Sequence, residues 1–226
     1  MNIYHNKANI IKKWWKKHTE IIKLKKIKKY LLQLLDINEL QKLSNNCNSI
    51  IKKCKGDGAG LSSGILIDMY LSSYLQSKIP EYNDNHNGEC DINICNIPLS
   101  LKKINGKSII ALDWSKNNNN VERERFICNI IIVNLKTEKW WKNNPNIKNS
   151  KIKITYNDVI PSGIYFIDKK YCKYNVILSK NNKTDSVIDN QNLYIILKRA
   201  LSLNLFIELP IPNKNIEFNI LHAFSK

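Results

Sequence analysis

Three polar residues in the segment GECDINICNIPLSLKKINGKS have types and a spacing that could do chemistry. Asp91 opens one alternating apolar stretch, and Ser100 and Lys102 lie at the end of a second one. Such alternation is typical of half-buried strands, and Cys95-Asn96 lies between them where a tight turn fits. The predicted hairpin returns Asp91 beside Ser100 and Lys102 on one face, because residues two apart on a strand share a face. A carboxylate that can bind a cation, next to a lysine that can position water, suits metal-assisted hydrolysis.

A second acid that could contribute lies upstream, inside a predicted helix. The segment LSSGILIDMYLSSYLQSKIP predicts a helix that begins near Ser62 or Ser63 and ends before Pro80. Its acid, Asp68, falls in mid-helix among apolar residues, where aspartate has poor propensity. Two interpretations stay open: a solvent-facing carboxylate on a tolerant turn, or one held for a cation.

The elements around these residues predict an α/β fold, with a mixed β-sheet flanked by helices. Apolar runs predict strands at KSIIALDWSKN, FICNIIIVNLK, KIKITY, GIYFID and YNVILSK, with FICNIIIVNLK at the centre of the sheet. Residues 190–209 predict a helix that runs into a strand, which Pro210 and Pro212 end. We expect an α/β core over residues 59–226, within one compact domain.

Residues 1–58 form a basic region with apolar residues at helical spacing and lysines on the other faces. The lysines either lie near phosphates or form a solvated face, and a helix on a membrane surface is a further alternative. The segment KGDGAG then breaks the pattern; it is not a phosphate loop, because no Gly-Lys-Ser/Thr follows it.

The net charge favours an anionic partner. Thirty-six Lys and Arg against 19 Asp and Glu give 36 − 19 = +17 over 226 residues, which suits nucleic acid or an anionic surface. An A/T-biased genome, which readily encodes Asn, Ile and Lys, is the alternative explanation. The six cysteines include no C-x-x-C pair, so zinc is not expected. With neither a signal peptide nor an apolar run of about 20 residues, we expect a reduced cytoplasm and no membrane.

A helix with an interior acid, followed by D-x8-S-x-K across a hairpin, resembles the PD-(D/E)xK nucleases, and among them the type II restriction endonucleases. The resemblance covers about a quarter of the chain, with a weaker echo in GIYFIDKK. It places Asp68 as the helix acid, Asp91 as the first motif acid and Lys102 as the lysine. Ser100 stands where the family has its second acid, and Cys90 where it often has proline. The missing charge can come from Glu89, Asp113 or Asp68, and spacing does not decide among them.

The resemblance implies an enzyme that hydrolyses phosphodiester bonds in double-stranded DNA with Mg²⁺ as cofactor. Mg²⁺ takes oxygen ligands, and one or two carboxylates with a substrate phosphate suffice. Asp91 would be the principal ligand, with the backbone carbonyl of Leu101 and the carboxylate of Asp68 as further candidates. Lys102 would orient or deprotonate the attacking water.

Loops that combine cations, amides and aromatic rings are the candidates for contacting DNA. Arginine can bind guanine or enter a narrow minor groove, asparagine can read adenine, and tryptophan can wedge between bases. The candidates are Trp114, Lys116, Asn117, Asn118, Arg123, Arg125, Trp140, Trp141, Lys180, Asn182 and Lys183. If the target is a palindrome, a two-fold homodimer follows.

Two other functions fit parts of the sequence. NDNHNGEC superficially resembles an HNH nuclease with His86 as base, but the second metal histidine and the C-x-x-C knuckles of that family are missing from the sequence. A DNA-binding protein without activity, such as a replication or regulatory factor, explains the charge equally well. It gives no reason for Asp68 and Asp91 to stand where they do in a chain so poor in acids.

Overall fold

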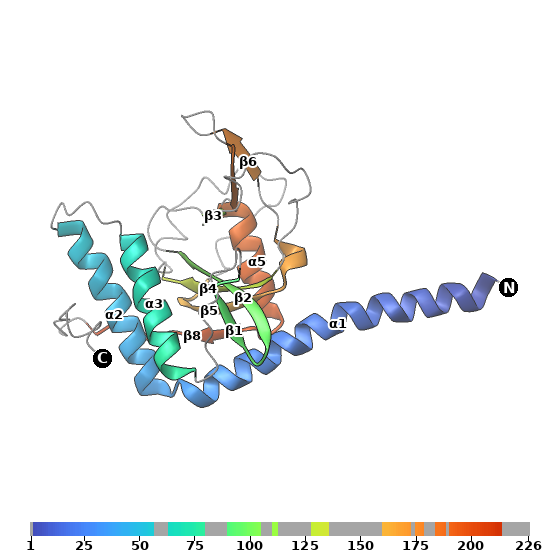
Figure 1. Ribbon diagram of the computed structural model, residues 1–226, viewed down its shortest axis with the longest axis horizontal. Coiled ribbons are helices and arrows are strands. Elements are labelled where there is room, and N and C mark those ends of the chain that lie inside the picture. The colour runs from blue at the N-terminus through green and yellow to red at the C-terminus, as the bar shows by residue number, and fades with distance from the viewer. Residues whose placement is uncertain are drawn as a thin grey trace.

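The fold was analysed in a computed structural model, which describes residues 2–56, 63–79, 90–104, 110–112, 128–135, 160–172, 175–178, 184–188 and 190–213. Within these ranges, the side chains of residues 2–14, 16–17, 55–56, 63–65, 68, 110–112, 175–178, 184–187 and 190–191 are not described. The described elements form two β-sheets and four α-helices with a short 3-10 turn (Figure 1).

Three helices precede the first strand. They are α1 (Asn2–Leu34), α2 (Ile37–Gly56) and α3 (Ser63–Lys78), so the helix predicted to start near Ser63 and end before Pro80 is confirmed. The basic region is two helices, because Asp36 interrupts it and caps α2: its Oδ1 accepts a hydrogen bond from the Glu39 amide over 2.8 Å.

The larger sheet has five strands in the order β1-β2-β4-β5-β8. They are β1 (Ile92–Ile94), β2 (Ile97–Ile104), β4 (Asn129–Asn134), β5 (Gly163–Ile167) and β8 (Phe206–Glu208). β2 and β4 pair in parallel and the other pairs are antiparallel, so the sheet is mixed. β4 is buried at all six residues and lies at the centre, as its continuous apolar run predicts.

A second sheet has three antiparallel strands in the order β3-β7-β6. They are β3 (Ile110–Leu112), β6 (Asn175–Leu178) and β7 (Thr184–Ile188). The sequence predicted strands at β3 and β6 but gave no prediction for β7. The predicted strand KIKITY lies outside the described residues.

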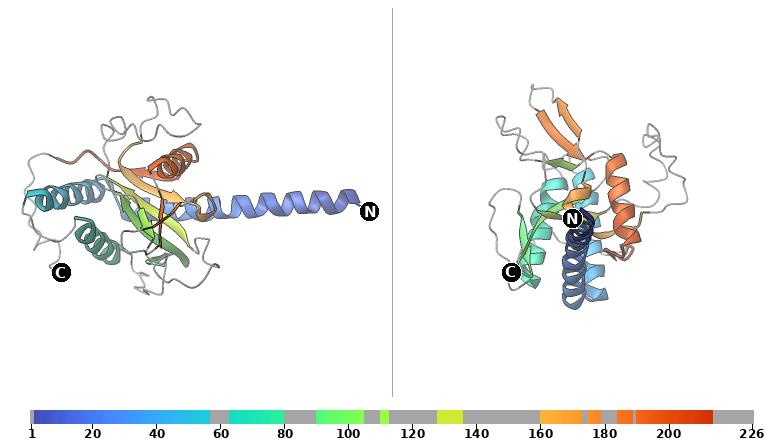
Figure 2. Two further views of the ribbon diagram at one scale, coloured as in Figure 1. Left: turned by 90° about the horizontal axis from the view of Figure 1, so that it is seen from above. Right: turned by 90° about the vertical axis from the view of Figure 1, so that its right-hand side faces the viewer.

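Helices cover both sides of the five-stranded sheet. Figure 2 shows α3 on one side and α5 (Asn190–Ser202) on the other, and α3 contacts β2 while α5 contacts β5. Buried side chains of all four helices and of the larger sheet join in one apolar cluster. The predicted α/β fold with a helix-flanked mixed sheet is therefore confirmed. Within the described ranges, no helix has the length and apolar character needed to cross a membrane.

Candidate active site

The candidate site is built on the β1–β2 hairpin. The two strands are joined by a two-residue turn in which Cys95 and Asn96 have φ of 53° and 60°. Positive φ at both central residues is the geometry that matches the twist of a tight hairpin. Ile92 pairs with Leu99, so the predicted turn and its register are confirmed, and Asp91 comes back beside Ser100.

Asp91 gathers three neighbours around one carboxylate oxygen. Its Oδ2 accepts a hydrogen bond from Ser100 Oγ over 3.0 Å and another from the Leu101 amide over 2.7 Å. Lys102 Nζ lies 3.7 Å from the same oxygen. The predicted placement of Asp91, Ser100 and Lys102 on one face is thus what the structure has.

The backbone of Leu101 faces the same edge of β2 as the Asp91 side chain. The amide of Leu135, the residue after β4, donates a hydrogen bond to the carbonyl of Ile104 on β2. Backbone groups of alternate residues point to the same edge of a strand, so the even-numbered residues of β2 direct theirs toward β4. Odd-numbered residues direct theirs toward β1: Leu99 accepts from the Asp91 amide, and Leu101 donates to the Asp91 side chain. The amide and carbonyl of one strand residue point to the same edge, so the Leu101 carbonyl also lies on the Asp91 side.

The polar groups of the site divide between buried and accessible. Ser100 is fully buried, whereas the side chains of Asp91 and Lys102 are 35% and 20% exposed. No described residue donates a hydrogen bond to Oδ1 of Asp91. Among the described residues, Asp91 Oδ1 is therefore left for a cation, and the Leu101 carbonyl lies on the same edge of β2. Both are hard oxygen ligands of the kind that Mg²⁺ binds.

The further acids proposed for the site are only partly placed. Asp68 lies within α3, which contacts β2, but its side chain is not described. Glu89 and Asp113 lie outside the described residues, as does His86. Among the side chains that are described, no group of three or more His, Cys, Asp or Glu gathers closely enough to hold a metal ion. The structure therefore does not decide which acid replaces the one missing at Ser100.

All of the predicted DNA-contacting residues also lie outside the described ranges. They are Trp114, Lys116, Asn117, Asn118, Arg123, Arg125, Trp140, Trp141, Lys180, Asn182 and Lys183. Their contribution stays a prediction.

Comparison with known proteins supports the fold. A solved structure described as a restriction endonuclease in complex with substrate DNA is similar to this chain, with a TM-score of 0.53 and 15% identity. The match covers 86% of this chain and 96% of that one. The fold is restriction-endonuclease-like. No family model matches the sequence, and no curated protein matches it either.

A second polar cluster of this restriction-endonuclease-like fold was not predicted as a site. Asn129, at the start of β4, donates from Nδ2 to Oε2 of Glu20 on α1 over 2.8 Å and accepts at Oδ1 from the Lys169 amide over 3.1 Å. Asn129 pairs with Leu99, the residue before Ser100, so its side chain lies on the face opposite to Ser100. Burial acts to raise the pKa of Glu20, but hydrogen bonds from Lys23 and Asn129 hold it below its usual range. The cluster anchors α1 to the sheet.

Asp168 and Arg199 extend this cluster toward α5. Asp168 is buried, follows β5 and caps the 3-10 turn at Lys169–Tyr171, where its Oδ1 accepts from the Lys170 amide. Its Oδ2 lies 2.7 Å from Lys170 Nζ, an ion pair without hydrogen-bond geometry. The Arg199 guanidinium stacks over the Tyr171 ring at 3.6 Å. The GIYFIDKK echo of the motif is therefore a cap that ties β5 to α5.

Proposed function

We propose that this chain is a type II restriction endonuclease, a Mg²⁺-dependent enzyme that cuts double-stranded DNA at a specific sequence. The observation that supports this most is the meeting of Asp91, the Leu101 backbone and Lys102 at one edge of β2, within 3.7 Å of Asp91 Oδ2. The restriction-endonuclease-like fold and the charge of +17 agree with it.

In this proposal, Asp91 Oδ1 and the Leu101 carbonyl hold the cation, with Asp68 as a further ligand. When bound, Mg²⁺ supplies charge neutralisation at the scissile phosphate and lowers the pKa of water. Lys102 contacts a phosphate oxygen and orients the attacking water, since its ammonium group lies beside Asp91 and is partly exposed. Ser100 holds Asp91 Oδ2 in place, which leaves Oδ1 for the cation.

A non-enzymatic DNA-binding protein is the second candidate, and one observation favours it. Ser100 stands in the position of the second motif acid. It is neutral and buried, and its hydroxyl donates a hydrogen bond to Asp91. A site with one fewer carboxylate binds Mg²⁺ more weakly. A chain of this fold that had lost cleavage would keep the positive charge and its DNA binding.

The target and the assembly belong to the same proposal. A palindromic target requires two equivalent active sites, one for each strand, so we expect a two-fold homodimer. Recognition is assigned to the predicted loop residues, among them Arg123 and Arg125.

The test compares four purified proteins on a large mixed-sequence DNA, with Mg²⁺ and then with EDTA. The proteins are the wild type, Asp91→Asn, Lys102→Gln and a matched control, Lys103→Gln. The control removes the same charge one residue along β2, on the opposite face. We expect discrete Mg²⁺-dependent fragments from the wild type and the control, and a loss of at least about 10²-fold in the other two.

Other results of this experiment would contradict parts of the proposal. Cleavage that survives both Asp91→Asn and Lys102→Gln places the active site elsewhere. A wild type that shifts DNA in a gel but never cuts it supports the second candidate. Sedimentation of the wild type on a palindromic duplex tests the homodimer independently of cleavage.

A further inference from the structure

The N-terminal half of α1 projects from the rest of the molecule. Figure 1 shows its first turns standing clear of the sheet and of the other helices. The helix is anchored from Glu20 onward, where Glu20 bonds to Asn129 and where Leu24, Ile27 and Leu31 are buried. At a rise of about 1.5 Å per residue, the helix from Asn2 to Glu20 is about 27 Å long, which is about eight base pairs of duplex.

The side of α1 that faces the body changes character where the helix leaves it. Positions three or four apart share a side of a helix, and Leu31, Ile27, Leu24 and Glu20 follow one another at that spacing. The same side continues through Lys17, Lys16 and Lys13, and then to Asn9 and Asn6. By this spacing, lysine and asparagine join Trp14 and Ile10 on the side of α1 that continues the core-facing stripe, and lysine contacts phosphates in protein–DNA complexes.

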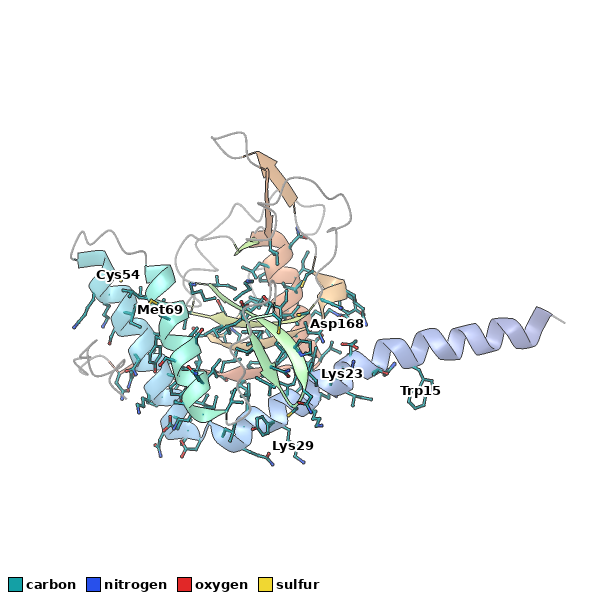
Figure 3. All side chains as sticks on the ribbon, viewed as in Figure 1. Trp15, Lys23, Lys29, Cys54, Met69 and Asp168 are labelled. Atoms are coloured by element: carbon teal, nitrogen blue, oxygen red, sulfur yellow. The ribbon has the colours of Figure 1, made fainter. Side chains whose placement is uncertain are left out.

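Two exposed apolar side chains mark the opposite side of α1. Trp15 is 61% exposed and lies on the side away from the body in Figure 3. Ile22, two helical turns further along α1, is also 61% exposed. Over its whole length α1 carries ten lysines against one acid, Glu20.

The projecting half begins close to the candidate active site. Asn129, which holds Glu20, is paired across the sheet with Leu99, and Leu99 directly precedes Ser100. Asn129 and Glu20 lie on the sheet face opposite to Ser100, so the projecting half begins one strand away from the candidate site and on the other face of the sheet.

We infer that the projecting half of α1, which carries Lys13, Lys16 and Lys17, is an arm that binds the DNA backbone. This inference rests on the proposed function in taking DNA as the ligand. Lysines on the arm neutralise phosphates and add affinity without adding sequence preference.

Binding measured against salt concentration tests the arm. The full chain is titrated with a fluorescent mixed-sequence duplex of about 30 base pairs in EDTA, so that nothing is cut, from about 50 to about 200 mM KCl. One variant carries Lys13→Gln, Lys16→Gln and Lys17→Gln. The matched control carries Lys25→Gln, Lys29→Gln and Lys52→Gln. These three lysines are exposed and lie outside the projecting half of α1. Glutamine keeps the helix propensity of lysine, and circular dichroism checks the helix content.

Each phosphate contact contributes about −0.9 to the slope of log affinity against log salt. We expect the slope of the arm variant to be shallower than that of the wild type by about 2 to 3, and the slope of the control to change by less than about 1. Equal slopes for the arm variant and the wild type overturn the inference. If the arm variant keeps its slope and Trp15→Lys lowers the sedimenting mass, the arm packs on a second copy of the chain instead. A wild type that never cuts DNA, with the expected change in slope, leaves the arm in place and removes only the endonuclease proposal.

Discussion

Ser100 donates a hydrogen bond over 3.0 Å to the carboxylate that we propose as the metal ligand, Asp91. The serine is fully buried. Ser100→Asp would place two carboxylates within hydrogen-bonding distance, and without a cation they cannot both ionise at low cost. In EDTA we expect a free energy of unfolding lower by roughly 2 kcal/mol, the scale of one to two pKa units.

Mg²⁺ reverses the penalty of Ser100→Asp if a cation binds beside Asp91. Thermal unfolding with and without Mg²⁺ measures this, and the increase in Tm should be larger for Ser100→Asp than for the wild type. Ser100→Ala is the control, because it removes the hydrogen bond and adds no charge. An increase in Tm that is the same in all three proteins would count against a cation at Asp91.

Tyr74 and Glu39 join α3 to α2 and give the protein an acid-sensitive contact. The Tyr74 hydroxyl donates to Oε2 of Glu39 over 2.7 Å, and this hydrogen bond is the largest cause of a lowered pKa for Glu39. Burial and the bond to Glu39 raise the pKa of Tyr74, so it stays a donor. A carboxyl whose pKa is lower in the folded state stabilises the fold above its unfolded value of 4.5, and this stabilisation is lost as the pH falls through the folded pKa.

Tyr74→Phe should therefore lower the free energy of unfolding by about 1 kcal/mol at pH 7. In a chain of this size that corresponds to about 2 to 4 °C in Tm. Denaturant unfolding at a series of pH values measures the difference, which should shrink below about pH 4. A difference that is constant with pH would mean that Tyr74 acts through packing alone.

Cys47 should be inert to alkylation while the protein is folded. It lies fully buried in α2, and burial raises the pKa of its thiol to about 12, so that the reactive thiolate is scarce at pH 8. Cys54, half-buried near the end of α2, serves as the internal control. Mass spectrometry after brief iodoacetamide treatment should find Cys54 modified and Cys47 free, and Cys47 modified only in denaturant. Early modification of Cys47 would show that α2 opens readily.

Gly163 allows β5 and β8 to approach closely. A Cβ at this position would lie 2.6 Å from the backbone oxygen of Ile207, a contact that a backbone cannot relieve cheaply. Gly163→Ala should lower the free energy of unfolding by about 2 kcal/mol or more, although a tolerated Gly→Ala change normally stabilises. Calorimetry measures Tm, and a Tm that is unchanged or raised would mean that β8 moves away without cost.

The hairpin and the central strand could be predicted because their signals are local. Alternation over Ile92–Ile94 and Ile97–Leu101 fixes which side chains share a face, and the buried run of β4 fixes its central place. β7 could not be predicted in this way. Its sequence, TDSVI, is polar over three residues, and it is a strand because it pairs with β3 on one side and β6 on the other.

The features that could not be predicted from the sequence depend on contacts between residues far apart in the chain. Nothing near Glu20 in the sequence indicates that it bonds to Asn129, 109 residues later. The acid replaced by Ser100 also depends on distant elements, because Asp68 comes from a helix that contacts β2. The resemblance supplied the motif positions, and the hairpin geometry shows that Asp91, Ser100 and Lys102 meet.

Lys28 on α1 binds the backbone oxygen and the side-chain oxygen of Asn204, 176 residues further along, and β8 covers the edge of β5 directly after it. During translation, the hairpin with Asp91 can form once residue 104 has left the ribosome, but β5 keeps an open edge until Phe206 follows. A chain that ends before Asn204 therefore lacks both the oxygens that bind Lys28 and the strand that covers the edge of β5. β8 is the last strand that the structure describes, whereas the candidate chemistry lies on the β1–β2 hairpin.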